Sequence, residues 1–366
     1  MDTPRSMRPI GRGAGRARIP RPPVRLPLHR MAARRLSAAA LALTCVVAAT
    51  GPARAAAHYE PGRGLHLLDD RLLIGGYLAV KGALLDGEPH RLVLDDLSAF
   101  VTYRFTDDLE IFTEWEVEDA IFIDADGPDV GRNVSSLERL YLQYEGPGEI
   151  RIRAGKLLTP IGIWNPIHAA PLVWTTSRPA ATDEFFDTGL TGVQIDKGFL
   201  LGELDAQATI FGQFTNQLDR TGARHPIHRG GGGRLQLGDL GRWQTAVSYL
   251  GFEDERENRW EHFFGADARL DTRSWEVTSE LAVIQPTRGA TTWSIYLQAV
   301  YDLGWGLYPV LRYEHAKLAE GEGDPFVFGL AYKPLPNVVL KAEGVVGRSD
   351  LDLGGNGFLT SFAVLF

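Results

Sequence analysis

The chain ends in NGFLTSFAVLF, residues 356–366, a segment that alternates between two kinds of position. One side of a strand would carry Phe358, Thr360, Phe362, Val364 and Phe366, because successive side chains in a strand point to opposite faces. The period of two predicts a β-strand with one mostly apolar face, and the chain stops on its last aromatic residue. Such a strand can close a soluble sheet or a membrane barrel, and the rest of the chain distinguishes the two.

The N-terminal region reads as an export signal. Two arginines precede an apolar run over residues 36–50, and the small-x-small tripeptide Ala53-Arg54-Ala55 follows it. These are the three parts of a secretory signal peptide, which we expect over residues 31–57 with a cut near Ala55 or Ala57. Residues 1–30 are rich in Arg and Pro without apolar periodicity, so we expect an upstream extension or a disordered segment there.

Charge and cysteine content bound the function of the exported part. Residues 1–56 hold eleven Arg and one Asp, which leaves 27 basic and 45 acidic residues and a net charge of −18 in the remainder. An acidic chain disfavours nucleic acid as a partner. The single cysteine, Cys45, lies in the predicted signal peptide, so the exported chain has neither disulfides nor thiol chemistry.

Residues 109–118 favour a membrane barrel over a soluble sheet. One face carries Leu109, Ile111, Thr113, Trp115 and Val117, and the other carries Glu110, Glu114, Glu116 and Glu118. Four carboxylates on one face cannot lie in a dry core. A water-filled lumen on the acidic face and lipid on the apolar face satisfy both halves of the pattern.

Alternating segments of this kind recur along the whole exported chain. After the segment at 71–80 they lie at 93–105, 109–118, 136–145, 149–158, 189–197, 203–214, 231–238, 243–252, 260–270, 275–285, 292–303, 307–316, 325–333, 338–347 and 356–366. Their number, sixteen, is even, as in single-chain bacterial barrels. We therefore predict an all-β fold: a closed antiparallel transmembrane β-barrel over residues 71–366, preceded by a short periplasmic segment at 58–70.

The connections between these segments alternate in length. Short turns of Gly, Asp, Asn and Pro character, such as 106–108 and 146–148, alternate with polar loops at 123–135, 215–229, 253–258, 317–324 and 348–356. A barrel with both termini on one rim has this alternation. Aromatic residues gather beside the short turns, as an interfacial girdle requires: Tyr103, Phe105, Trp243, Trp275, Tyr301, Trp305 and Tyr332.

The longest connection follows the fifth strand and reads TPIGIWNPIHAAPLVWTTSRPAATDEFFD from Thr159 to Asp187. Its four prolines and two tryptophans make it stiff and partly apolar, and a loop of this length in a compact fold is normally functional or disordered. The run Gly155–Gly162, Pro171, the Arg178-Pro179 pair and the terminal Phe366 resemble the porin superfamily of Gram-negative outer membranes. The similarity is greatest to its phosphate-selective porin-like branch.

The resemblance implies a trimeric diffusion channel in the outer membrane whose third extracellular loop folds into the lumen. It implies outer-membrane lipids, the barrel-assembly machinery and small hydrophilic solutes as partners, with Phe366 as the assembly signal. On this basis we expect the loop to narrow the pore through Pro160, Trp164, His168, Trp174, Arg178, Asp183, Glu184 and Asp187. We expect no cofactor and no enzymatic activity.

Selectivity is predicted from the charges on the inferred lumen face. Phosphate selection needs a ladder of basic residues, but acidic residues outnumber basic ones on that face, so we expect a general or weakly cation-preferring pore. The predicted pore wall comprises Glu110, Glu114, Glu116, Arg139, Arg151 and Arg153. These arginines either form salt bridges within the wall or face Asp183, Glu184 or Asp187 of the loop and create a transverse field.

Three other functions remain open on the sequence. A non-conducting barrel could act as an adhesin, receptor or structural scaffold through its acidic loops. His262 and Ser279 both have outward parity and could belong to an acyl hydrolase, although no nucleophile motif surrounds the serine. His225 and His228 with Asp219 could bind a metal, but a third convincing ligand is missing, so we expect no metal site.

Overall fold

A computed structural model describes residues 57–125, 127–130, 134–219, 226–239, 241–255, 258–349 and 355–366, which belong to one compact unit. The predicted extension (1–30) lies outside the described residues, as does the predicted signal peptide (31–57) apart from Ala57. Among the described residues, no helix is both long and apolar enough to cross a membrane.

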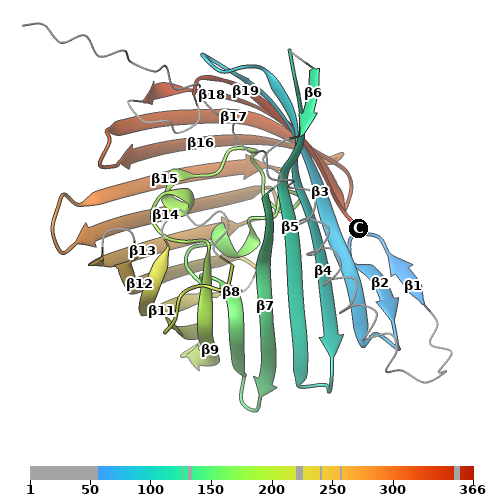
Figure 1. The fold of residues 1–366 in the computed structure, drawn as a ribbon, viewed down its shortest axis with the longest axis vertical. Coiled ribbons are helices and arrows are strands. Elements are labelled where there is room, and N and C mark those ends of the chain that lie inside the picture. Colours follow the sequence, from blue (N-terminus) through green and yellow to red (C-terminus); the bar gives the residue numbers. More distant parts are fainter. Residues whose placement is uncertain are drawn as a thin grey trace, which may run out of the picture. The chain divides into compact units, whose positions relative to one another are not determined.

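Sixteen antiparallel strands pair in chain order and close into a barrel (Figure 1). They are β3 (Leu72–Leu85), β4 (Arg91–Arg104), β5 (Leu109–Asp124), β7 (Val134–Gly146), β8 (Ile150–Leu158), β9 (Gly189–Leu201), β10 (Leu204–Gln213), β11 (Ile227–Asp239), β12 (Trp243–Asp254), β13 (Arg259–Asp271), β14 (Trp275–Pro286), β15 (Thr292–Tyr301), β16 (Leu307–Lys317), β17 (Glu322–Leu335), β18 (Val338–Ser349) and β19 (Gly357–Leu365). The predicted all-β barrel of sixteen strands is confirmed.

Several strands run further than their side-chain alternation predicts. The loops expected at 253–258 and 317–324 shrink to 255–258 and 318–321, and only residues 202–203 separate β9 from β10. Backbone pairing needs no particular side chain, so the ladder continues beyond the last patterned residue. A short extra strand, β6 (Gly127–Val130), also pairs with the far end of β5.

The two rims of the barrel differ, although the predicted alternation in length holds only in part, because four connections on the long-loop rim have just four or five residues. Seven connections on one rim, which we call the short-turn rim, have between two and five residues. The opposite, long-loop rim carries the connection at 159–188. Phe105 and Trp275 lie exposed beside short turns, and Trp275 packs on Tyr301 with ring centroids 4.7 Å apart. An aromatic girdle at this rim is therefore present.

Along each strand, apolar side chains point outward and polar ones inward. In β16, Leu311 and Tyr313 are 52% and 49% exposed, whereas Arg312 and Glu314 between and beside them are 1% and 2% exposed. The outer surface is a continuous apolar band, and the interior holds the charged groups. This is the arrangement of a barrel with lipid outside and water or polar groups inside.

The seam between β19 and β3 closes the barrel. Pairing runs from Gly357 opposite Leu85 to Leu365 opposite Tyr77, and the last residue then exchanges two backbone hydrogen bonds of 2.9 Å with Gly76. The ring of Phe366 covers Gly76: a Cβ there would lie 2.9 Å from the ring and 2.2 Å from the Ser98 carbonyl oxygen. Only glycine fits beneath the terminal aromatic residue.

The segment 58–70, expected as a plain periplasmic extension, contains a hairpin. β1 (His58–Glu60) pairs with β2 (Gly64–Leu67), and β2 pairs with the start of β3. The alternation over so few residues is too short to predict these strands from sequence.

Replacing Gly76 with alanine is expected to weaken closure of the barrel. Its methyl group would overlap the Ser98 carbonyl oxygen and the Phe366 ring, and overpacking of this kind costs about 1–3 kcal/mol. The folded fraction by heat-modifiable gel mobility and the urea unfolding midpoint should both fall. Gly355→Ala is the matched control, because its nearest neighbour would be the Asp86 carbonyl oxygen at 3.7 Å. Equal loss in both variants would contradict the role assigned to the seam.

Candidate functional site

Residues 159–188, which we call the inward loop, leave the wall between β8 and β9 and enter the barrel (Figure 1). The loop contains a 3-10 turn, η1 (Asn165–Ile167), and one helical turn, α2 (Ala180–Asp183). Its two ends are tied together: Thr159 donates from its backbone N–H to the Thr188 carbonyl (2.8 Å) and from its hydroxyl to the Asp187 carbonyl (2.7 Å). Because these hydrogen bonds hold the two ends of the loop together, the loop enters the lumen as one folded unit.

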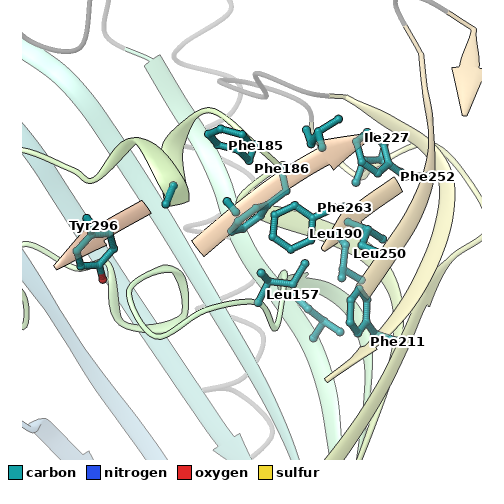
Figure 2. Close-up of a cluster of buried hydrophobic side chains, with 14 residues drawn as sticks. Leu157, Phe185, Phe186, Leu190, Phe211, Ile227, Leu250, Phe252, Phe263 and Tyr296 are labelled. Atoms are coloured by element: carbon teal, nitrogen blue, oxygen red, sulfur yellow. The ribbon is translucent and has the colours of Figure 1, made fainter. Parts of the chain in front are cut away.

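An apolar cluster fixes one side of the inward loop to the wall (Figure 2). Phe185 and Phe186 of the loop are buried beside Phe263 of β13, and the Phe186 and Phe263 rings meet edge-to-face at 5.2 Å. Ile161 and Ala181 of the loop also belong to the cluster, and buried residues of β8 to β15 complete it: Leu157, Leu190, Phe211, Ile227, Leu250, Phe252, Ala282, Ile284 and Tyr296. This part of the lumen is dry, because apolar side chains fill it.

Wall carboxylates hold the backbone of the loop. Glu343 of β18 accepts from the N–H groups of Thr176 (2.9 Å) and Ser177 (2.7 Å). Glu280 of β14 accepts from two further loop amides, at 3.1 and 3.0 Å. Irregular backbone away from water needs such partners, since an unpaired buried amide is costly.

Two more glutamates and two cations complete the attachment. Glu314 accepts from the Ala180 N–H (2.9 Å), and Glu276 accepts from the Trp174 indole (2.8 Å). Arg312 donates to the Thr175 hydroxyl at 2.7 Å, and Lys341 donates to the Ala170 carbonyl at 2.8 Å. The loop is therefore bound to β14, β16 and β18, across the barrel from the strands that carry it.

Part of the open space that remains lies between the inward loop and β4, β5 and β7. One cavity of about 210 Å³, the acidic cavity, has seven acidic and three basic residues in its lining. They are Asp95, Asp96, Glu116, Glu118, Glu138, Asp187 and Asp219, with Lys156, Arg178 and Lys341. The excess of carboxylates gives this space a negative potential.

A second cavity of about 460 Å³, the arginine cavity, lies beside the other face of the same loop segment. Its charged lining is mostly basic: Arg139, Arg151, Arg153, Arg234 and Arg269, with Asp196. Pro160 and Ile163 of the loop also line it. A third cavity of about 390 Å³, the mouth cavity, includes Asp183 and Glu184 in its lining. Charges of opposite sign are thus gathered in different parts of the lumen.

Burial shifts the pKa of two loop residues in the acidic cavity. Desolvation raises the pKa of Asp187 to about 6, although a hydrogen bond from Gln217 (2.6 Å) and the charge of Lys156 act in the opposite direction. Desolvation lowers the pKa of His168, whose Nδ1 lies 2.9 Å from the Asn165 carbonyl oxygen. At neutral pH the histidine is therefore uncharged.

Half of the predicted loop residues meet at one place. Trp164, His168, Arg178 and Asp187 line the acidic cavity, and the Arg178 guanidinium lies 5.0 Å from the Trp164 ring centroid. The other four are placed elsewhere. Pro160 lines the arginine cavity, Trp174 is bound to Glu276, and Asp183 and Glu184 line the mouth cavity.

The predicted wall arginines pair within the wall. Arg139 forms an ion pair with Glu114, and Arg151 pairs with Glu145 at 2.6 Å. Arg153 donates to Gln143 at 2.7 Å and lies 3.9 Å from Asp196. Each arginine has an acidic or amide partner on a neighbouring strand, so the geometry favours the salt-bridge alternative over a field directed at the loop.

The predicted wall acids have separate surroundings. Glu116 lines the acidic cavity and accepts from the Tyr77 hydroxyl at 2.6 Å. Glu114 is held by Arg139 and by the Ser98 hydroxyl, and Glu110 accepts from Gln143 at 2.9 Å. Of the three, only Glu116 lies in the lining of the acidic cavity.

The tally of lumen charges predicted from sequence overestimates the charge that faces open space. Six charged residues with inward parity enter that tally but bind the inward loop: Glu276, Glu280, Glu314, Glu343, Arg312 and Lys341. Of these, Lys341 also lines the acidic cavity and Glu314 the mouth cavity. Sequence periodicity places a side chain on a face and cannot say what covers it.

Asp95 and Asp96 were not predicted as site residues from the sequence. In a regular strand adjacent residues face opposite sides, so only one of the two would be expected to face the lumen. The ladder between β4 and β5 shifts register between Leu94 and Asp96, and both aspartates line the acidic cavity. A β-bulge allows this. Two adjacent acidic residues within an apolar strand were the available signal.

The other catalytic and metal candidates are not assembled among the described residues. The ladder partner of Ser279 is Ala268, six residues from His262, and His262 instead lies 2.8 Å from the Tyr249 hydroxyl. His228 contacts Asn216, and Asp219 accepts from the Leu137 N–H. His225 lies outside the described residues.

Comparison with known proteins agrees on the fold. The structure is similar to Salmonella typhi OmpF in complex with daunomycin (TM-score 0.60, 12% identity, 85% of this chain and 99% of that chain). It is similar to the anion-selective porin from Comamonas acidovorans (TM-score 0.57, 13% identity, 80% of this chain and 98% of that chain). It is also similar to the trimer form of Vibrio cholerae OmpT, an outer membrane protein (TM-score 0.55, 11% identity, 81% of this chain and 99% of that chain). At these identities the likeness establishes the barrel fold alone.

The sequence comparisons are sparser. No family model matches the chain. An uncharacterized protein of Aquifex aeolicus is 34% identical over 95 residues, which cover 26% of this chain and 21% of that protein. The match thus spans about a fifth of the relative's length. The similarity to the phosphate-selective branch remains a prediction.

Neutralising Glu343 is expected to loosen the inward loop. Glu343→Gln leaves one oxygen for two loop amides, and hydrogen bonds to charged groups contribute about 1.5–3 kcal/mol. Hydrogen–deuterium exchange at the Thr176 and Ser177 amides should therefore accelerate roughly 10- to 100-fold. Glu322→Gln, which removes an exposed ion pair with Lys317, is the control and should leave these amides unchanged. Exchange at the wild-type rate in Glu343→Gln would argue against the anchor.

Proposed function

We propose that this chain is a porin-like channel of the bacterial outer membrane, through which small hydrophilic solutes diffuse passively with a preference for cations. The barrel has a polar interior, and the inward loop narrows it without filling it. The acidic cavity carries the proposal, since it lies between the loop and the opposite wall and has seven acidic residues against three basic ones.

The attachment of the loop supports a fixed constriction. The apolar cluster and the wall carboxylates bind the loop to β10–β18, so its other face stands at a set distance from β4, β5 and β7. A non-conducting scaffold has no need of this division of the lumen. Carboxylates around a narrow aqueous space attract cations and repel anions.

The channel would lie in the outer membrane and assemble there as a trimer. The apolar outer band and the aromatic residues beside the short turns suit an outer membrane entered after export, with Phe366 read by the barrel-assembly machinery. Homotrimers are proposed because a structurally similar barrel, Vibrio cholerae OmpT, is described in a trimer form. No catalytic step is included in the proposal.

Recordings in planar bilayers test conduction and selectivity together. The wild-type protein should give stepwise conductance and favour cations. A unit charge about 8 Å from a passing ion contributes about 0.5 kcal/mol in water. Removing one such charge changes the permeabilities of cations and of anions by about 2.3-fold in opposite directions, so the double variant Asp95→Asn/Asp96→Asn should lower the cation-to-anion permeability ratio by up to roughly 30-fold. Glu322→Gln at the exposed rim should change it little. Absence of conductance steps in the wild type would support the scaffold alternative.

Selectivity should also depend on pH through Asp187. Because the pKa of this carboxyl is raised to about 6, it is charged at pH 7 and loses its charge as the pH falls through 6. Cation preference should decrease between pH 7 and pH 5. Asp187→Asn, which keeps an acceptor for Gln217, should show a lower preference at pH 7 and a smaller change on acidification. The same pH response in both proteins would exclude Asp187 as its source.

A further inference from the structure

The N-terminal hairpin is not needed to close the barrel. β1 and β2 stand beside the start of β3 at the short-turn rim (Figure 1), whereas closure runs through β19 and β3. In the hairpin His58 pairs directly with His66, and Glu60 pairs with Gly64. Directly paired residues of antiparallel strands share a face. His58, Glu60 and His66 therefore project from one side of the hairpin.

These side chains converge. The His58 and His66 rings stack with centroids 4.5 Å apart and an interplanar angle of 18°. Ligand atoms of His58, His66 and Asp70 all lie within 4.8 Å of one another, and Glu60 Oε2 lies 3.9 Å from His66 Nε2. Two imidazoles and two carboxylates thus gather on one side of an element that the proposed channel does not use.

The hydrogen bonding of His66 is that of a metal ligand. Its Nδ1 lies 3.0 Å from Asp70 Oδ1, so Nδ1–H donates to the carboxylate and the lone pair remains on Nε2. His66 Nε2 is buried and has no hydrogen-bond partner among the described residues. Histidines that bind metals commonly donate their other ring N–H to a carboxylate in this way. An acceptor left buried and unpaired otherwise costs about 1–3 kcal/mol.

We propose that His58, His66 and Glu60 bind a divalent transition-metal ion such as Zn²⁺ at the short-turn rim, with Asp70 as the residue that positions His66. Imidazole and carboxylate ligands suit zinc, and three protein ligands leave a position for water. Zinc bonds of about 2.0–2.1 Å place neighbouring ligand atoms about 3.3 Å apart. Rotation of the Glu60 side chain, which is 45% exposed, would close the present 3.9 Å separation to that value. Rotation of the exposed His58 ring out of the stack would direct its lone pair at the same ion. The bound ion would hold the start of the exported chain against the barrel.

Zinc titration of the full-length, exported protein in detergent, after treatment with a chelator, tests the site. Calorimetry should show one Zn²⁺ per chain, and Co²⁺ should give the absorption of a tetrahedral complex. His66→Ala and His58→Ala should each weaken binding by at least tenfold. Asp70→Asn should weaken it about 10- to 100-fold while leaving the stoichiometry at one.

The controls separate the site from unfolding and from other histidines. His90→Ala changes an exposed histidine in the loop between β3 and β4 and should bind zinc like the wild type. Heat-modifiable gel mobility should show that every variant retains a folded barrel. Lack of saturable zinc binding by the wild type, or wild-type affinity in His66→Ala, would overturn the proposal, whereas conduction would be unaffected by either result.

A competing arrangement is distinguished by the same variants. If export cuts after Ala55, the new amino group lies two residues before His58 and could bind a metal together with that imidazole alone. Binding lost in His58→Ala but retained in His66→Ala would place the ion at the amino terminus and overturn the hairpin site. Loss in both variants supports it.

Discussion

A strand surrounded by hydrocarbon has no water to satisfy its N–H and C=O groups, so every strand of such a barrel needs a partner on both sides. Here the requirement is met at one seam, where β19 pairs with β3 and Phe366 exchanges two hydrogen bonds with Gly76. Closure removes both sheet edges. It also creates an enclosed interior, and the remaining features of the molecule concern how that interior is filled.

A thirty-residue loop inside a barrel brings irregular backbone away from bulk water. The wall supplies hydrogen-bond acceptors and donors to this backbone. Glu280 and Glu343 each accept from two loop amides, and Arg312 and Lys341 donate to loop oxygens. A carboxylate in such a place is tolerable only because it is hydrogen-bonded. The apolar cluster around Phe186 and Phe263 supplies the hydrophobic part of the attachment. Polar and apolar contacts together fix the loop, and the space left around it is divided into the acidic, arginine and mouth cavities.

The strands could be predicted from sequence because each carries its own period of two, and all sixteen were found. The ends could not, since pairing beyond Phe252 or Lys197 depends on the neighbouring strand. The loop could be assigned to the lumen by resemblance and by its prolines and tryptophans. Its anchors join residues more than a hundred positions apart, such as Thr176 and Glu343, and no local pattern records such contacts. Asp95 and Asp96 were missed for a local reason, the bulge that turns both toward the cavity.

The same residue type therefore has two roles that alternation alone cannot separate. Glu343 and Glu116 are both buried glutamates on inward faces, yet Glu343 binds the loop backbone and Glu116 lines the acidic cavity. A carboxylate that accepts two amide hydrogen bonds is largely compensated, whereas one in a cavity lining contributes to the potential that a passing ion meets. In the proposed channel, the charge relevant to permeation would thus depend on which residues the inward loop covers and which line a cavity. The net charge of the lumen is therefore a poor guide to the charge that faces a cavity. The arginines of the arginine cavity illustrate this for positive charge, because Arg139 and Arg151 are paired with acidic residues of the wall.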